Sequence, residues 1–116
     1  MTLDKINPTK TNSWKKLKSL KSVIDLKTLF KNDNDRLKKY SISIDELYVD
    51  YSKNLIDDEI LNLLITLSKE CKLHDAIHKQ FTGEKINETE DRAVLHTALR
   101  SSDKKSPFFK IFQKDR

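Results

Sequence analysis

Phe81–Arg100, with the sequence FTGEKINETEDRAVLHTALR, contains the only glycine of the chain and passes directly from turn residues into helix-forming residues. Gly83 can adopt a positive φ, so we expect it to end one helix and turn the backbone. Asn87 or Thr89 is then expected to cap a second helix whose first turn carries acidic residues, where carboxylates suit the helix dipole. Apolar residues at i,i+4 spacing within Ala93–Leu99 predict a broad apolar face on that helix.

The length and composition of the chain exclude several classes of protein. Its 116 residues form one domain or part of one, and 36% hydrophobic with 35% charged residues is a polar but foldable composition. A single glycine excludes glycine-rich loops that cradle phosphates. Cys71 is the only cysteine, so no internal disulfide can form. No apolar run approaches the ~20 residues of a membrane span, and the first residues lack the apolar centre of a secretion signal, so we expect a cytoplasmic protein.

The positive charge is concentrated at the front of the sequence. Residues 1–40 hold 11 Lys and Arg against 4 Asp and Glu (+7), and residues 41–116 hold 12 against 14 (−2). Such a front end could bind nucleic acid or an anionic lipid surface. The lysines are not interleaved with aromatic residues, so we favour a solvated lysine-rich face and expect neither a nucleic-acid nor a membrane partner.

The amino-terminal third predicts short helices after a polar leader, residues 1–12, that we expect to be disordered. Asn12 or Ser13 is expected to cap the first helix, whose apolar positions recur at steps of three and four: Trp14, Leu17, Leu20 and Ile24. We expect this amphipathic helix to pack on its own protein rather than on a membrane. Asp25 is expected to start a second short helix, and residues 35–40 resume a helical turn after the interruption at Asn32–Asp35.

The middle of the chain predicts one β-hairpin followed by two helices. Tyr40–Ile44 and Leu47–Tyr51 each alternate as half-buried strands do, and such a hairpin needs a partner surface because it is marginal alone. Ile60–Cys71 is the most apolar helix, so we expect it to be buried on most of its circumference. Leu73–Phe81 predicts a shorter helix. The fold class is therefore mainly α with one short β-hairpin.

Two groups of residues have the composition of a metal site. Cys71, His74 and His78 have the spacing of zinc ligands on one helix, but Leu73 indicates a helix break and no second cluster supplies a further ligand. Asp33–Asp35 offers oxygen ligands, but the glycine and glutamate that a calcium loop requires are missing, so a capping turn is the better interpretation. We predict no metal site.

Other polar residues also favour structural roles. We interpret His96 as a hydrogen-bonded residue on a packed helix rather than as a base. Ser52–Asn54 could form a phosphate pocket, but a connection between strand and helix explains it equally. Asp57 and Asp58 are better explained by the helix dipole than by acid–base catalysis.

Two strings carry a family resemblance. Residues 83–100, GEKIN-x-TE-x-RAVLHTALR, and residues 49–56, VDYSKNLI, resemble in order and separation the amino-terminal region of the glucose-6-phosphate isomerase (phosphoglucose isomerase) family. The resemblance covers residues 13–100 and weakens in the tail, residues 101–116, where a divergent loop and the apolar run Phe108–Phe112 could begin the next domain.

The resemblance implies a part of a larger enzyme. Family members interconvert glucose 6-phosphate and fructose 6-phosphate without a cofactor, act as homodimers, and carry catalysis in two sugar-phosphate-binding α/β (SIS-type) domains beyond the matched region. The family's catalytic glutamate, histidine and lysine have no counterpart here, so the resemblance assigns no catalytic, cofactor-binding or metal residue. We expect these 116 residues to be an amino-terminal segment, a truncated or interrupted product, that is inactive alone and prone to self-association. The alternative is a freestanding basic helical module that binds nucleic acid or lipid.

Overall fold

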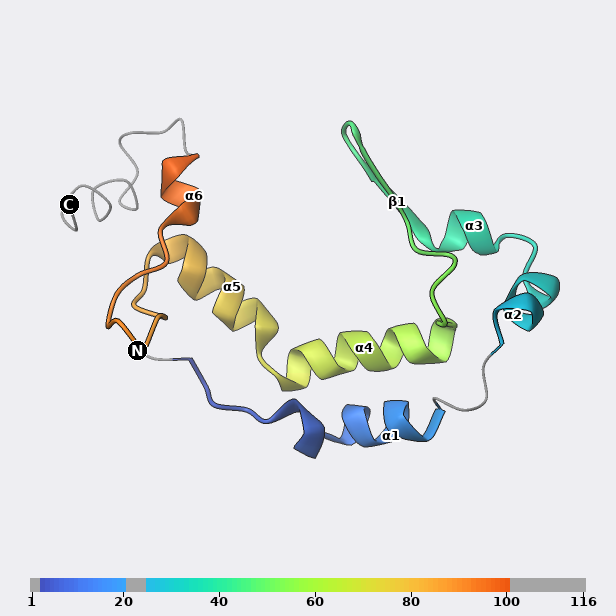
Figure 1. Ribbon diagram of the computed structural model, residues 1–116, viewed down its shortest axis with the longest axis horizontal. Helices are drawn as coiled ribbons and strands as arrows, with labels where there is room; N and C mark the ends of the chain where they lie inside the picture. Colours follow the sequence, from blue (N-terminus) through green and yellow to red (C-terminus); the bar gives the residue numbers. More distant parts are fainter. Residues whose placement is uncertain (1–2, 21–24, 101–116) are drawn as a thin grey trace. The chain divides into compact units, whose positions relative to one another are not determined.

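The computed structural model describes residues 3–20 and 25–100, and this part is mainly helical with one antiparallel hairpin, as predicted (Figure 1). The chain divides into two compact units, which we call the first unit (Pro8–Leu67) and the second unit (Met1–Asn7 with Ser68–Arg116). The elements in chain order are η1 (Pro8–Lys10), α1 (Asn12–Leu20), α2 (Leu26–Asn32), α3 (Arg36–Lys39), β1 (Ser41–Ile44), β2 (Leu47–Asp50), α4 (Asp58–Glu70), α5 (Leu73–Thr82) and α6 (His96–Leu99).

The amino-terminal helices of the first unit begin at side-chain caps. Thr11, and not Asn12 or Ser13, caps α1, because its hydroxyl accepts the Trp14 amide at 3.2 Å while donating to the Pro8 carbonyl at 2.7 Å. Asp25 caps α2 as predicted, since its carboxylate accepts the Thr28 amide at 2.9 Å.

The hairpin has one apolar face and one polar face. Ile42 pairs with Val49 and Ile44 with Leu47, so these four side chains lie on the same side of the ribbon. The alternation predicts one face for Tyr40, Ile42 and Ile44 and another for Leu47, Val49 and Tyr51. This prediction is wrong, because the register places the apolar residues of both strands on one surface. A two-residue turn joins the strands, with Asp45 at φ 50°.

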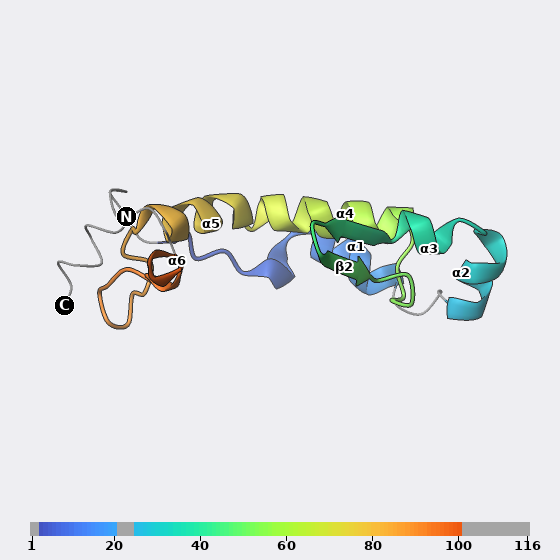
Figure 2. The ribbon, with the colours of Figure 1, turned by 90° about the horizontal axis from the view of Figure 1, so that it is seen from above.

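Asp57 precedes helix α4 and caps it, since its carboxylate accepts the Ile60 amide at 2.8 Å, as expected for the acidic head of this helix. The expectation that α4 is buried on most of its circumference is wrong, because part of its apolar surface is exposed. Ile60 is buried, but Leu64 and Ile65 are 42% and 46% exposed. Helix α1 lies along α4 in both views (Figures 1 and 2), and side chains of both helices line a groove.

In the second unit, Gly83 ends α5 as predicted. It has φ 73°, and the chain turns there after Thr82. The next helix begins later than expected, at His96, because residues 87–92 close a tight turn instead of capping it. Asn87 and Arg92 exchange backbone hydrogen bonds of 3.1 and 3.3 Å. The Asn87 carboxamide also bonds within this turn, since it accepts the Glu90 amide at 3.3 Å and donates to the Glu90 carboxylate at 2.9 Å.

Large buried apolar side chains are few in the described ranges. Tyr40, Ile60 and Ala98 are the buried hydrophobic residues there. The predictions made for Ile24 and for the apolar run at residues 108–112 lie outside the described residues. The expected partner surface for the hairpin is not found among residues 3–20 and 25–100, since the apolar residues of both strands are exposed.

Candidate functional site

Arg36 is the centre of the most ordered polar cluster in the first unit. Its side chain is 1% exposed, and its guanidinium donates to three backbone carbonyls of the segment that joins β2 to α4. The distances are 2.8 Å to the Ser52 carbonyl, 2.9 Å to the Asn54 carbonyl and 2.8 Å to the Ile56 carbonyl. A buried cation with several acceptors is satisfied without a carboxylate partner, so Arg36 clamps this loop.

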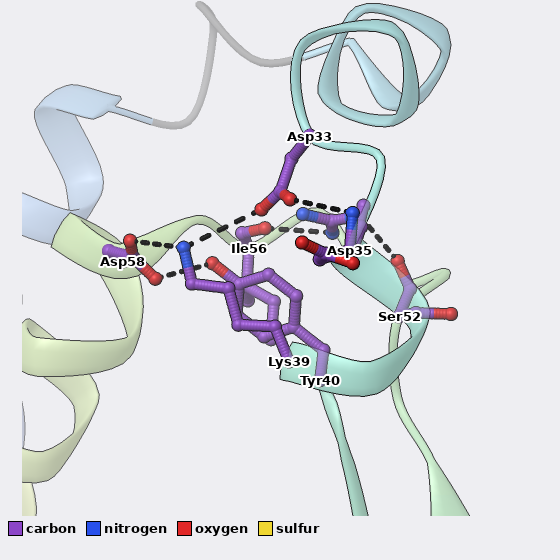
Figure 3. A network of polar contacts seen from close by, with 8 residues as sticks. Asp33, Asp35, Lys39, Tyr40, Ser52, Ile56 and Asp58 are labelled. Atoms are coloured by element: carbon purple, nitrogen blue, oxygen red, sulfur yellow. Dashed lines mark hydrogen bonds and ion pairs between the residues drawn. The ribbon is translucent and has the colours of Figure 1, made fainter.

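Tyr40 packs against the clamp and extends it to α4. The Arg36 guanidinium carbon lies 4.6 Å from the centre of the Tyr40 ring, and the Tyr51 ring meets Tyr40 edge-on at 5.9 Å. The Tyr40 hydroxyl donates to Asp58 at 2.8 Å, and the Lys39 ammonium binds the other oxygen of the same carboxylate (Figure 3). These contacts join α3, the base of the hairpin and the start of α4.

The titration of these groups follows from the same contacts. The hydrogen bond from Lys39, followed by that from Tyr40, holds the pKa of the Asp58 carboxyl below its ordinary value. Asp58 in turn raises the pKa of Lys39, and burial followed by the bond to Asp58 raises the pKa of Tyr40. Each group is stabilised in the form that it already has at neutral pH, which is the behaviour of a structural network.

The role of Arg36 was not predicted from the sequence. Its spacing of four residues from Tyr40 was the available local signal, since such pairs meet on a helix. Its other partners are backbone carbonyls 16 to 20 residues later, which no side-chain pattern reveals.

Ser52–Asn54 lies in the clamped connection, in agreement with the interpretation of this stretch as a strand-to-helix link. Ser52 is buried, and its amide donates to Asp50 at 2.9 Å. Lys53 and Asn54 point into solvent. Asp57 and Asp58 serve the helix start and the Lys39–Tyr40 contact, in agreement with their predicted structural roles.

The sequence-derived metal candidates are not brought together. Within residues 3–20 and 25–100 no three His, Cys, Asp or Glu side chains form a group that could hold a metal ion. His74 and His78 line a depression with Lys69 and Lys72, and Cys71 lies apart from them in the link between α4 and α5. Asp33 forms the expected capping turn, accepting the Asp35 amide at 3.1 Å (Figure 3).

His96 is exposed at the start of α6. This differs from the expectation of a hydrogen-bonded histidine on a packed helix. The turn that precedes it is held by polar contacts: the Arg92 guanidinium pairs with Glu90, and Lys85 pairs with Asp91 at 3.0 Å. The described part of this stretch therefore provides a rigid turn and a short helix, with His96 open to solvent.

A groove in the first unit runs between α1 and α4. Apolar side chains and lysines line it, and the lining residues include Trp14, Lys15, Leu17, Lys18, Leu64 and Leu67. Among the helices that the structure describes, none is long and apolar enough to cross a bilayer.

Comparison with known proteins adds the family context. The model of the family described as "Phosphoglucose isomerase" matches residues 50–110. Proteins named glucose-6-phosphate isomerase are similar over most of the chain: 52% identity over 101 residues in Wigglesworthia glossinidia brevipalpis and 48% over 100 residues in Christiangramia forsetii, covering 83% and 84% of this chain. Glucose-6-phosphate isomerase 1 of Colwellia psychrerythraea is 53% identical over 91 residues, or 76% of the chain. The matched part spans 18%, 18% and 17% of these relatives respectively.

Proposed function

Because this chain belongs to the phosphoglucose isomerase family, we propose that it is the amino-terminal helical segment of a glucose-6-phosphate isomerase, the enzyme that interconverts glucose 6-phosphate and fructose 6-phosphate in glycolysis and gluconeogenesis. The observation that carries the proposal is the identity of 52% maintained over 101 residues, which includes both the clamped loop and the turn after Gly83.

In this proposal the segment contributes structure and not chemistry. Isomerisation through an enediolate needs a base that can take up a proton near neutral pH, such as a carboxyl with a raised pKa or a lysine with a lowered one. The shifts found in the described residues go the other way: hydrogen bonds lower the pKa values of Asp4, Asp25, Asp50 and Asp58, and raise those of Lys39, Lys72 and Lys79. These directions support a structural role for the segment, and we expect the 116 residues alone to be inactive.

The rest of the machinery belongs to other residues of a family-length protein. We assign the sugar phosphate site to two SIS-type α/β domains, and we place the whole enzyme in the cytoplasm as a homodimer that uses no cofactor. This assignment is supported by the family match and by the small share of each relative that the chain covers.

A coupled assay of fructose 6-phosphate conversion tests the proposal. The purified 116-residue chain should give no turnover above the buffer rate. A fusion in which residues 1–100 replace the aligned segment of the Wigglesworthia relative should give turnover within about tenfold of that relative.

The matched control is the relative's remainder without any amino-terminal segment, which should be inactive. Turnover by the 116-residue chain would contradict the assignment of catalysis to other residues. A folded but inactive fusion, beside an active relative, would contradict the proposed function.

A further inference from the structure

The hairpin presents an apolar face that nothing in the described residues covers. The four side chains that the register places on this face are all at least two-fifths exposed: Ile42 49%, Ile44 62%, Leu47 61% and Val49 44%. The opposite face carries Ser41, Ser43, Tyr48 and Asp50. A ribbon with one wholly apolar face is the pattern of a strand pair that covers a core, and water is a poor environment for it.

The base of the ribbon is held rigidly. The Tyr51 amide donates to the Tyr40 carbonyl at 2.9 Å, and Tyr40 is fixed by Arg36 and Asp58. From this base the two strands extend away from α3 and α4 (Figure 1). The network of the candidate site therefore attaches the base of the ribbon to α3 and α4, and the apolar face beyond it is exposed.

We propose that this face is an internal docking surface, covered by further residues of the same polypeptide in a family-length isomerase. The inference rests on the proposed function, because it needs the residues that the relatives have beyond the 18% matched here. Four half-exposed aliphatic side chains offer on the order of 400 Å² of surface, well below the ~800 Å² per partner of a stable interface between separate chains. A patch of this size favours a partner that is covalently linked, because such a partner loses little translational freedom on docking.

Cysteine reactivity measures whether the face is covered. Ile44→Cys places a thiol on the apolar face, and Ser43→Cys places a matched control on the polar face one residue earlier. Each variant is made in the 116-residue chain and in the fusion with the Wigglesworthia remainder. Alkylation rates are read by mass spectrometry of the hairpin peptide, so that Cys71 does not interfere, at concentrations where sedimentation shows the monomer of the 116-residue chain.

In the 116-residue chain both cysteines should react at similar rates. In the fusion, Cys at position 44 should react at least about tenfold more slowly, while Cys at position 43 keeps its rate. Equal reactivity of the two positions in the fusion would overturn the proposal. So would protection of position 44 that is lost when the fusion is diluted to monomers, because that result would assign the face to a second copy.

The proposed function fails separately. An active fusion in which position 44 stays reactive would support the isomerase assignment and contradict the docking surface. An inactive fusion in which position 44 is protected would support the docking surface and contradict the isomerase assignment. If the fusion is insoluble, the intact Wigglesworthia relative with cysteines at the two aligned positions gives the same decision.

Discussion

At the scale of single residues, the first unit depends on how one buried cation is satisfied. Arg36 lies against Phe30 and Tyr40, with its guanidinium carbon 5.4 and 4.6 Å from their ring centres, and its N–H groups donate to three backbone carbonyls. A guanidinium carries five N–H donors spread over three nitrogens in a rigid plane, whereas an ammonium carries three donors on one nitrogen. The spacing of the carbonyls and the two flanking rings therefore suits arginine better than lysine.

Arg36→Lys tests this requirement. The lysine ammonium has fewer N–H donors than the guanidinium, and all of them are on one nitrogen. It therefore leaves carbonyls of the 52–56 loop unpaired in a buried site, and the free energy of unfolding should fall by about 2–4 kcal/mol. Urea unfolding followed by circular dichroism measures the change. Arg92→Lys is the control, since Arg92 pairs with Glu90 at the surface and its replacement should change stability by less than about 0.5 kcal/mol. A loss of that small size for Arg36→Lys would show that the clamp is dispensable.

The Asp58 contact makes stability depend on pH. Lys39 and Tyr40 lower the pKa of Asp58 in the folded chain, so this stabilisation is complete above the unfolded value of about 3.9 and disappears as the pH falls through the lower folded pKa. Asp58→Asn should therefore be less stable than the parent chain at neutral pH and equally stable at the acid end.

The measurement is urea unfolding at a series of pH values. Lys39→Met removes the first cause of the shift and should show the same convergence with the parent chain in acid. A stability difference that stays constant through the acid range would contradict the role given to this carboxylate.

At the scale of elements, the sites where helices end are determined by short-range chemistry. Asp25 caps α2 and Gly83 ends α5, and each uses groups within a few residues of the helix end. The start of α6 differs, because the Asn87 side chain and backbone are used by the turn to Arg92. Asn87 could either cap a helix or close this turn, and in the structure it closes the turn.

Gly83→Ala tests the left-handed residue after α5. A β-carbon at φ 73° is unfavourable, so we expect a loss of about 1–2 kcal/mol in the stability of the second unit. Hydrogen exchange of α5 amides reports this unit directly. His78→Ala is the control, because position 78 is exposed within α5 and accepts alanine without strain. Unchanged α5 protection in Gly83→Ala would contradict the role of the glycine.

At the scale of the whole molecule, the described residues expose several large apolar side chains, and the amino-terminal part of the chain is strongly basic. Trp14, Leu64, Leu47 and Phe81 are 40%, 42%, 61% and 59% exposed, and residues 1–40 carry a net charge of +7. We expect the apolar surface to cause self-association of the 116-residue chain, measurable by sedimentation velocity over a range of concentrations. A monomer at every concentration would contradict this expectation.

The basic front end is expected to be a solvated face. Fluorescence anisotropy with a short DNA duplex should therefore show no binding at physiological salt. Binding in the micromolar range that weakens steeply with added salt would instead favour a nucleic-acid module. The fusion with the Wigglesworthia remainder is the matched control, since its activity should not respond to the duplex.

The sequence by itself determined the elements and the family of this protein. Periodicity located the hairpin and the helices before Gly83, Gly83 and Asp25 located helix ends, and the two strings at residues 49–56 and 83–100 indicated the family that the comparisons support. These are local properties, because caps, turns and alternation involve residues a few positions apart.

Only the tertiary structure decided which faces are covered and which polar groups meet. Arg36 finds its carbonyls 16 to 20 residues away, the cross-strand register gathers the apolar side chains of two strands on one face, and α4 is exposed where the sequence predicted burial. An apolar pattern states that a side chain favours burial, but burial also needs a partner surface, and the position of that surface is a property of the folded chain.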